Sequence, residues 1–150
     1  MILHERMHLN ATPDQIWAIL ADPPLMEQWD PKCVRCQADG NPVRAGLRYR
    51  ATFRLSGPEQ ETQCEVLECR PGRTLAIRFT TQAPRGGQVD ETFRLQSSGE
   101  GTEVTHEIDF KHSGLPWWLK VFMKVLDLFG HQRGKSSLDG IAELAGRSTQ

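Results

Sequence analysis

The sequence predicts an α+β fold in which an antiparallel sheet of about seven strands is covered by a long C-terminal helix. Windows of alternating apolar and polar residues follow one another between residues 33 and 110, with turn residues between them. Two short helical segments come directly after an earlier window of this kind, at residues 2–9. The last part of the chain, from Leu115 to about Ala145, carries apolar residues at helical spacing.

Seven windows are expected to form strands, at residues 2–9, 33–38, 47–55, 61–69, 74–81, 89–95 and 102–110. Window 47–55 alternates most regularly, with apolar residues on one face and arginines on the other. Turn residues separate the later windows so closely that neighbouring strands should be antiparallel. Each strand then has one apolar face, which the C-terminal helix is expected to cover.

The segment after the first strand window carries clear helix boundaries. The side-chain oxygen of Thr12 can accept an orphan backbone N–H, and Pro13 suits the first helical position, where its missing donor costs nothing. Pro23 and the proline after it end this helix, and Trp29-Asp30-Pro31 leads out of a second short one. Two short helices are therefore expected between the first and second strands.

Composition and charge exclude several classes of protein. The chain has 150 residues and a net charge of −1, from 18 basic and 19 acidic residues, so no overall field draws it to nucleic acid. No apolar run reaches the roughly 18 residues of a membrane span, and no signal peptide is visible. We expect one domain at residues 1–146, a frayed tail at 147–150 and a cytoplasmic location. Whether the protein is a monomer or a dimer stays open.

Three motifs, taken in order, resemble the START-like or SRPBCC superfamily. NATPDQIWAILADPPLMEQWDP (residues 10–31) is similar to its opening, VLECRPGRTLAIRF (66–79) to its mid-sheet hairpin and SSGEGTEVTHEIDF (97–110) to its last hairpin. The resemblance, which includes polyketide cyclase/dehydrase-type proteins, implies the helix-grip fold: a curved sheet around the last helix, with a cavity for a hydrophobic ligand. It does not imply one activity, because this fold hosts carriers, cyclases, hydroxylase subunits and chaperone co-factors.

The expected inner surface is rich in aromatic side chains. Such a surface fits a pocket for a small molecule, which is mostly apolar, and it fits an ordinary core equally well. The candidate lining residues from the strands and the last helix are Tyr49, Phe53, Phe79, Phe93, Phe110, Trp118 and Phe122.

Two polar residues are expected among them. His106 lies at period two between Val104 and Ile108, and Glu91 lies between Val89 and Phe93, so both should point inward. A lone inward histidine is most often a hydrogen-bonded core residue, but it can also hold a ligand carbonyl or transfer a proton. A buried carboxylate needs a partner or a wet cavity. The candidates for catalysis or ligand binding are therefore His106, Glu91 and, as a hydrogen-bond donor, Tyr49.

Four cysteines invite a zinc interpretation, which we reject. Residues three or five apart in a strand point to opposite faces, so neither Cys33 and Cys36 nor Cys64 and Cys69 should converge on one metal. We therefore expect reduced thiols, with no metal, no disulfide and no cofactor.

Two surface interpretations are weighed against simpler ones. Trp117-Trp118 with Lys120 and Lys124 could form a membrane-touching amphipathic segment, but the core-facing side of the last helix explains it better, so no stable membrane insertion is expected. Arginines at 48, 50 and 54 form a basic stripe without aromatic neighbours, which indicates a solvated sheet face and no nucleic-acid partner.

The sequence favours a carrier or sensor that binds a hydrophobic small molecule, such as a lipid, polyketide or other aromatic compound. The first alternative is a polyketide cyclase/dehydratase-type enzyme that uses the inward His/Glu pair. The second is a protein-interaction domain of the chaperone-activator type, which would show a filled core and an exposed apolar patch.

Overall fold

The computed structural model describes residues 2–38, 42–54, 58–81, 87–112 and 136–148, and within them seven strands form one sheet. Its strand order is β1-β7-β6-β5-β4-β3-β2, and all neighbours are antiparallel, as predicted. The strands are β1 (Ile2–Leu9), β2 (Cys33–Gln37), β3 (Arg48–Phe53), β4 (Gln60–Arg70), β5 (Thr74–Thr81), β6 (Gln88–Ser98) and β7 (Gly101–His112).

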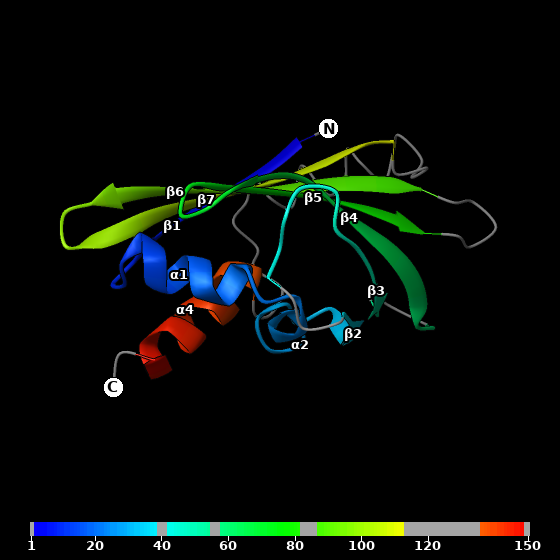
Figure 1. Ribbon diagram of the computed structural model, residues 1–150, viewed down its shortest axis with the longest axis horizontal. Coiled ribbons are helices and arrows are strands. Elements are labelled where there is room, and N and C mark those ends of the chain that lie inside the picture. The colour runs from blue at the N-terminus through cyan, green and yellow to red at the C-terminus, as the bar shows by residue number, and fades with distance from the viewer. Residues whose placement is uncertain (1, 39–41, 55–57, 82–86, 113–135, 149–150) are drawn as a thin grey trace.

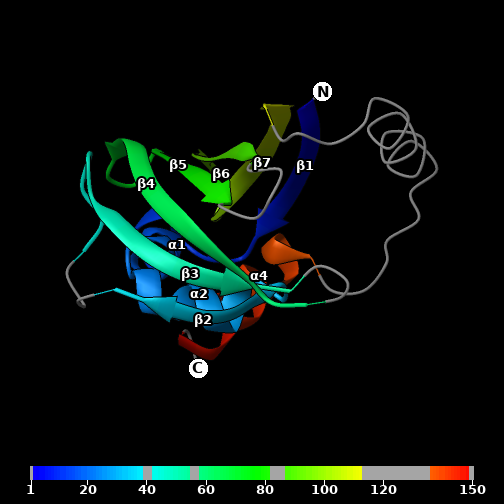
Figure 2. The ribbon, with the colours of Figure 1, turned by 90° about the vertical axis from the view of Figure 1, so that its right-hand side faces the viewer.

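The helices lie on one side of this sheet, which curves around them (Figures 1 and 2). They are α1 (Pro13–Leu20), the 3-10 helix η1 (Pro23–Leu25), α2 (Met26–Trp29) and α4 (Ser137–Ser148). The two helices expected after the first strand are thus confirmed, and Thr12 caps α1 as predicted. The cap is reciprocal, because Thr12 Oγ1 accepts from the backbone of Gln15 at 3.2 Å and the Gln15 side chain accepts from the backbone of Thr12 at 2.9 Å.

The C-terminal helix is confirmed by α4, while residues 115–135 of the expected helix lie outside the described residues. A reciprocal cap begins α4: Ser136 N donates to Asp139 Oδ2 at 3.0 Å, and Asp139 N donates to Ser136 Oγ at 3.2 Å. The helix packs against α2 at Gly140. A Cβ at this position would lie 2.7 Å from the Cα of Trp29 and closer still to its carbonyl oxygen, so only glycine lets the two backbones approach this far.

Cross-strand pairing places an uninterrupted row of side chains on the inner face. Leu75 pairs with Phe93, Phe93 with His106, and His106 with Glu5. In the adjacent row, Ile77 pairs with Glu91. Because directly opposite residues share a face, this register brings the two predicted polar residues to neighbouring positions on β6 and β7.

The prediction that Cys33 and Cys36 point to opposite faces of their strand is wrong. The register of β2 against β3 shifts between Cys33 and Arg35, and this irregularity turns both cysteines to the buried side. All four cysteines are free thiols, and within the described ranges no three histidine, cysteine or acidic residues are grouped as a metal site would need. Burial raises the pKa of Cys33 to about 12 and that of Cys36 to about 11, so these thiols stay protonated near neutral pH.

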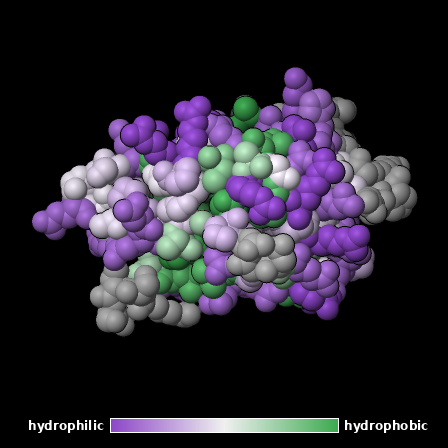
Figure 3. All heavy atoms as spheres, in the orientation of Figure 1, coloured by the Kyte–Doolittle hydropathy of each residue, from purple (hydrophilic) through white to green (hydrophobic). Residues whose placement is uncertain are grey.

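The outer face of the sheet is covered by paired charges. Arg48 contacts Glu65 at 2.9 Å, and Arg94 contacts Glu107 at 2.8 Å. This agrees with the expectation of a solvated sheet face. Figure 3 looks at the molecule from the side, with the sheet edge-on, and shows hydrophilic residues over much of the surface and hydrophobic ones near its centre. Among the helices that the structure describes, none has the length and apolar character required to cross a membrane.

Candidate functional site

A buried histidine and a buried glutamate form a hydrogen-bonded pair on the inner face. His106 Nε2 lies 3.1 Å from Glu91 Oε2, and the two residues are only 3% and 8% exposed. Burial raises the pKa of Glu91, but the hydrogen bond and charge of His106 outweigh it, so the pKa of this carboxyl lies below its ordinary value. An ionised carboxylate can only accept a hydrogen bond, so Nε2 of His106 carries the hydrogen atom and donates the hydrogen bond to Glu91.

Aromatic rings hold the imidazole in place. The ring of Phe93 is stacked on that of His106, with centroids 4.2 Å apart and planes 5° from parallel. The indole of Trp29 meets Phe93 edge-on at 5.5 Å and 85°. These contacts on one side and Glu91 on the other fix the orientation of the ring, as a histidine that binds or transfers a proton requires.

A second pair of charged residues lies close to the first. The Asp30-Pro31 turn follows α2, and Asp30 Oδ1 accepts from the backbone N–H of Lys32 at 2.9 Å. Burial and Glu91 raise the pKa of Asp30, against the opposing effect of Lys32. Burial disfavours the Lys32 ammonium, but Glu91, Asp30 and Glu5 outweigh it and raise the pKa of Lys32. The inner face thus carries charges that influence one another across β1, β6, β7 and this turn.

The chemistry open to this arrangement follows from the hydrogen bond. With Nε2 bound to the carboxylate, the Nδ1 lone pair of a neutral His106 can accept a hydrogen bond or a proton. Glu91 would stabilise the imidazolium that forms. The two residues therefore act as one coupled unit.

Three other predicted site residues on strands, Tyr49, Phe53 and Phe79, face the same side. Tyr49 is buried, which raises the pKa of its phenol, so the group is a neutral donor near pH 7. Phe79 is buried and meets the half-buried Phe53 edge-on at 5.5 Å. Phe110 is half-buried. Trp118 and Phe122 lie outside the described residues, as do Trp117, Lys120 and Lys124.

Sequence reasoning missed three residues of this region. Trp29 and Asp30 are only 3% and 2% exposed, yet their motif indicates by itself no more than a helix boundary. Lys32, the third residue, follows them in the turn. The sequence signal that could have pointed to this region is Asp30, which lies between an aromatic residue and a proline at the end of the apolar α2. Such an aspartate is either a turn residue or a buried charge, and here it is both.

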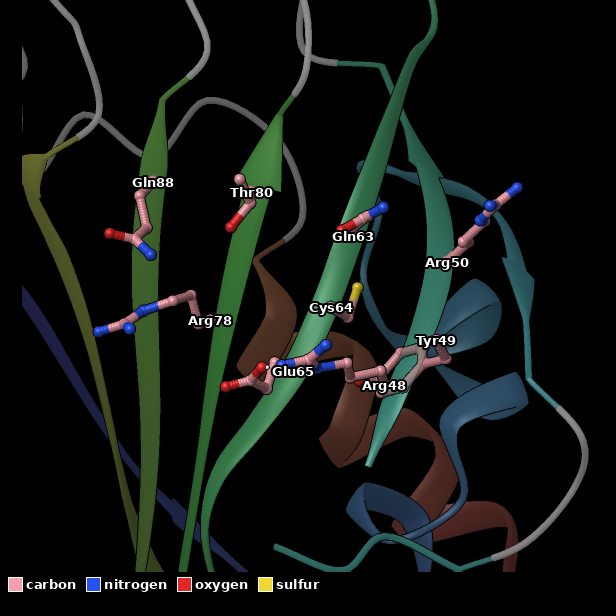
Figure 4. A pocket seen from close by; sticks show the side chains of 9 residues that line it. All are labelled: Arg48, Tyr49, Arg50, Gln63, Cys64, Glu65, Arg78, Thr80 and Gln88. Carbon is pink, nitrogen blue, oxygen red and sulfur yellow. Dashed lines mark hydrogen bonds and ion pairs between the residues drawn. The ribbon is translucent and has the colours of Figure 1, made fainter. Parts of the chain in front are cut away.

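A hollow of about 480 Å³ lies over β3 to β6 and is lined mostly by polar residues of the outer face, together with the buried Tyr49 and Cys64 (Figure 4). Its ion pairs include Arg48 with Glu65 at 2.9 Å and Arg78 with Asp90 at 2.9 Å and 3.0 Å. This charged hollow differs in place and chemistry from the expected apolar pocket. It is lined by Arg48, Tyr49, Arg50, Gln63, Cys64, Glu65, Arg78, Thr80 and Gln88.

Comparisons with known proteins agree with this architecture. A model of the family described as polyketide cyclase / dehydrase and lipid transport matches residues 2–146. Protein CV1439 from Chromobacterium violaceum is similar at a TM-score of 0.71 and 19% identity, over 96% of each chain. Protein TTHA0849 from Thermus thermophilus is similar at 0.70 and 18%, over 100% of each chain.

One further structure is named for its genetic setting. DynU16, from the dynemicin biosynthetic locus, is similar at a TM-score of 0.65 and 19% identity, over 98% of this chain and 48% of its own. At these identities the solved structures establish the fold alone. No curated protein matches the sequence.

Proposed function

We propose that this chain, which belongs to the polyketide cyclase / dehydrase and lipid transport family, binds an uncharged or weakly polar hydrophobic small molecule between its sheet and its C-terminal helix. The family suggests a ligand-binding domain. The observation that carries the proposal here is the His106–Glu91 pair, held at 3.1 Å among aromatic side chains on the inner face. A few oriented polar groups within an apolar surface are the composition of a small-molecule site.

The pocket lining that we propose joins the polar pair to the aromatic residues that the sequence predicts for the inner surface. Its members are Tyr49, Phe53, Phe79, Glu91, Phe93, His106, Phe110, Trp118 and Phe122. The role is that of a carrier or sensor, and a cytoplasmic location stays a prediction.

Native mass spectrometry of gently purified protein tests this proposal directly. We expect a co-purified lipophilic compound that leaves on denaturation. His106→Ala should then weaken binding of that compound by the value of one hydrogen bond, about 0.5–1.5 kcal/mol. Thr105→Ala is the matched control, because Thr105 neighbours His106 on β7 but faces the other side. Equal affinity of wild type and His106→Ala would remove His106 from the site.

A second function is favoured by one observation, the coupling of His106 to an ionised Glu91. A histidine oriented by a carboxylate can act as a general base, as cyclase/dehydratase chemistry on an aromatic polyketide-like substrate requires. In that case His106→Ala should lower turnover about 100-fold or more, with little effect on binding. His106→Gln, which retains an N–H donor toward Glu91, separates loss of chemistry from loss of folding.

A further inference from the structure

Trp29 carries a buried hydrogen-bond donor that has no acceptor. Its side chain is 3% exposed, and Nε1 has no hydrogen-bond partner. An orphaned donor destabilises a folded protein, because the group has lost its water without gaining a partner. Trp29 Nε1 is the one such side-chain atom among the described residues. An indole N–H that stays unpaired beside a polar pair indicates a place for an acceptor that comes from outside the chain.

A charged residue lies three residues further along the chain. Lys32 is half-buried, and its ammonium is within electrostatic range of Glu91, Asp30 and Glu5. Three carboxylates thus balance the ammonium of Lys32, whereas the indole N–H of Trp29 is left without an acceptor.

The aromatic stack connects this turn to the polar pair. Trp29 contacts Phe93 edge-on, and Phe93 lies flat on His106. The unpaired indole donor thus belongs to the same end of the inner face as the His106–Glu91 pair.

The charges nearby decide which acceptor fits. The carboxylates of Glu91, Asp30 and Glu5 all influence Lys32, so this end already holds more acidic groups than basic ones. An added carboxylate or phosphate would be repelled by them at close range. A carbonyl oxygen carries no net charge and has a lone pair for the indole donor.

We propose that the indole N–H of Trp29 is the polar end of the pocket and takes the uncharged carbonyl oxygen of an otherwise apolar ligand, such as a ketone or lactone. This inference rests on the proposed function, since it names the ligand class of the same pocket. The indole N–H donates one hydrogen bond to the oxygen.

Equilibrium dialysis with three rigid tricyclic probes tests the ligand class. Fluorenone carries the carbonyl, fluorene lacks it, and fluorenecarboxylate replaces it with an anion. Wild-type protein should bind fluorenone about three- to tenfold more tightly than fluorene, the value of one hydrogen bond, and should bind fluorenecarboxylate most weakly.

Trp29→Phe keeps an aromatic ring against Phe93 but removes the donor. This variant should bind fluorenone and fluorene equally. Its folded state should lose no hydrogen bond, because the indole N–H of Trp29 has no partner within the protein. Trp17→Phe is the matched control, because Trp17 lies on α1 and should keep the preference of the wild type.

The outcomes separate the two proposals. If none of the three probes binds, the proposed function fails and the inference fails with it. If fluorenone and fluorene bind equally well to wild type, or Trp29→Phe keeps the preference, only the carbonyl site is refuted. Tightest binding of fluorenecarboxylate would also overturn it, because the site would then select an anion.

Discussion

Replacing Gly140 with alanine should destabilise the protein through one contact between two helices. The added Cβ would lie 2.7 Å from both the Cα and the carbonyl carbon of Trp29, and nearer to the carbonyl oxygen. These are backbone atoms, so no flexible side chain can move aside. Either α4 shifts away from α2 or the turn that follows Trp29 is displaced.

The size of the effect follows from two opposing contributions. Alanine favours a helix interior over glycine by about 1 kcal/mol, which stabilises the variant. Overpacking a tight contact costs about 1–3 kcal/mol and sometimes more, and a clash with backbone belongs at the upper end. We expect Gly140→Ala to lower the free energy of unfolding by about 2 kcal/mol.

Urea denaturation followed by circular dichroism measures this change, and the same helix supplies a control. A Cβ at Gly146 would meet no atom within 4 Å, so Gly146→Ala should gain up to about 1 kcal/mol from helix propensity alone. The midpoints of the two variants should move in opposite directions from wild type, with unchanged slopes. If Gly140→Ala proves as stable as Gly146→Ala, the close approach of α4 to Trp29 is not a constraint and the reasoning fails.

Two further predictions concern buried groups. Glu91→Gln should reduce the loss of stability that the protein shows in acid. Burial raises the pKa of Glu91, but His106 outweighs it and lowers this pKa below the ordinary 4.5. The ionised carboxylate therefore stabilises the fold above pH 4.5, and this stabilisation is lost as the pH falls through the lower pKa of the folded state. Urea titrations between about pH 3 and pH 7 check this, with the exposed Glu61→Gln as control, and parallel acid limbs for wild type and Glu91→Gln would contradict it. In Ellman assays of the folded protein the half-buried Cys69 should react about tenfold faster than the three buried thiols, and two or more fast thiols would disprove their protection.

Most of the fold could be predicted from local patterns. The period-two alternation of β3 and β5 and the Thr12-Pro13 helix start each reflect a short-range rule, and the structure confirms them. The cysteine argument failed because it applied that period across a β-bulge. The irregularity between Cys33 and Arg35 depends on how β2 pairs with β3, and no local sequence rule specifies such a shift.

The candidate site was predictable only in part, for a similar reason. Period two placed Glu91 and His106 on the inner face, but the 3.1 Å contact between them depends on the register of β6 against β7. Trp29 ends α2 and Lys32 lies in the turn after it, so the placement of both depends on the packing of α2 against α4. The need for glycine at position 140 follows from its contact with the backbone of Trp29 on another helix, which the sequence alone does not indicate.

The pairing of the sheet has a consequence for how such a chain can diverge. In β5, Ile77 belongs to the inner face and Arg78 to the outer one, where it pairs with Asp90. A substitution at either position changes one face and leaves the other untouched. A single inserted residue would instead exchange the two faces for the rest of the strand, burying arginine and exposing isoleucine. Ligand preference can therefore drift through point changes on inner positions, whereas changes in chain length are tolerated at the turns and selected against within the strands.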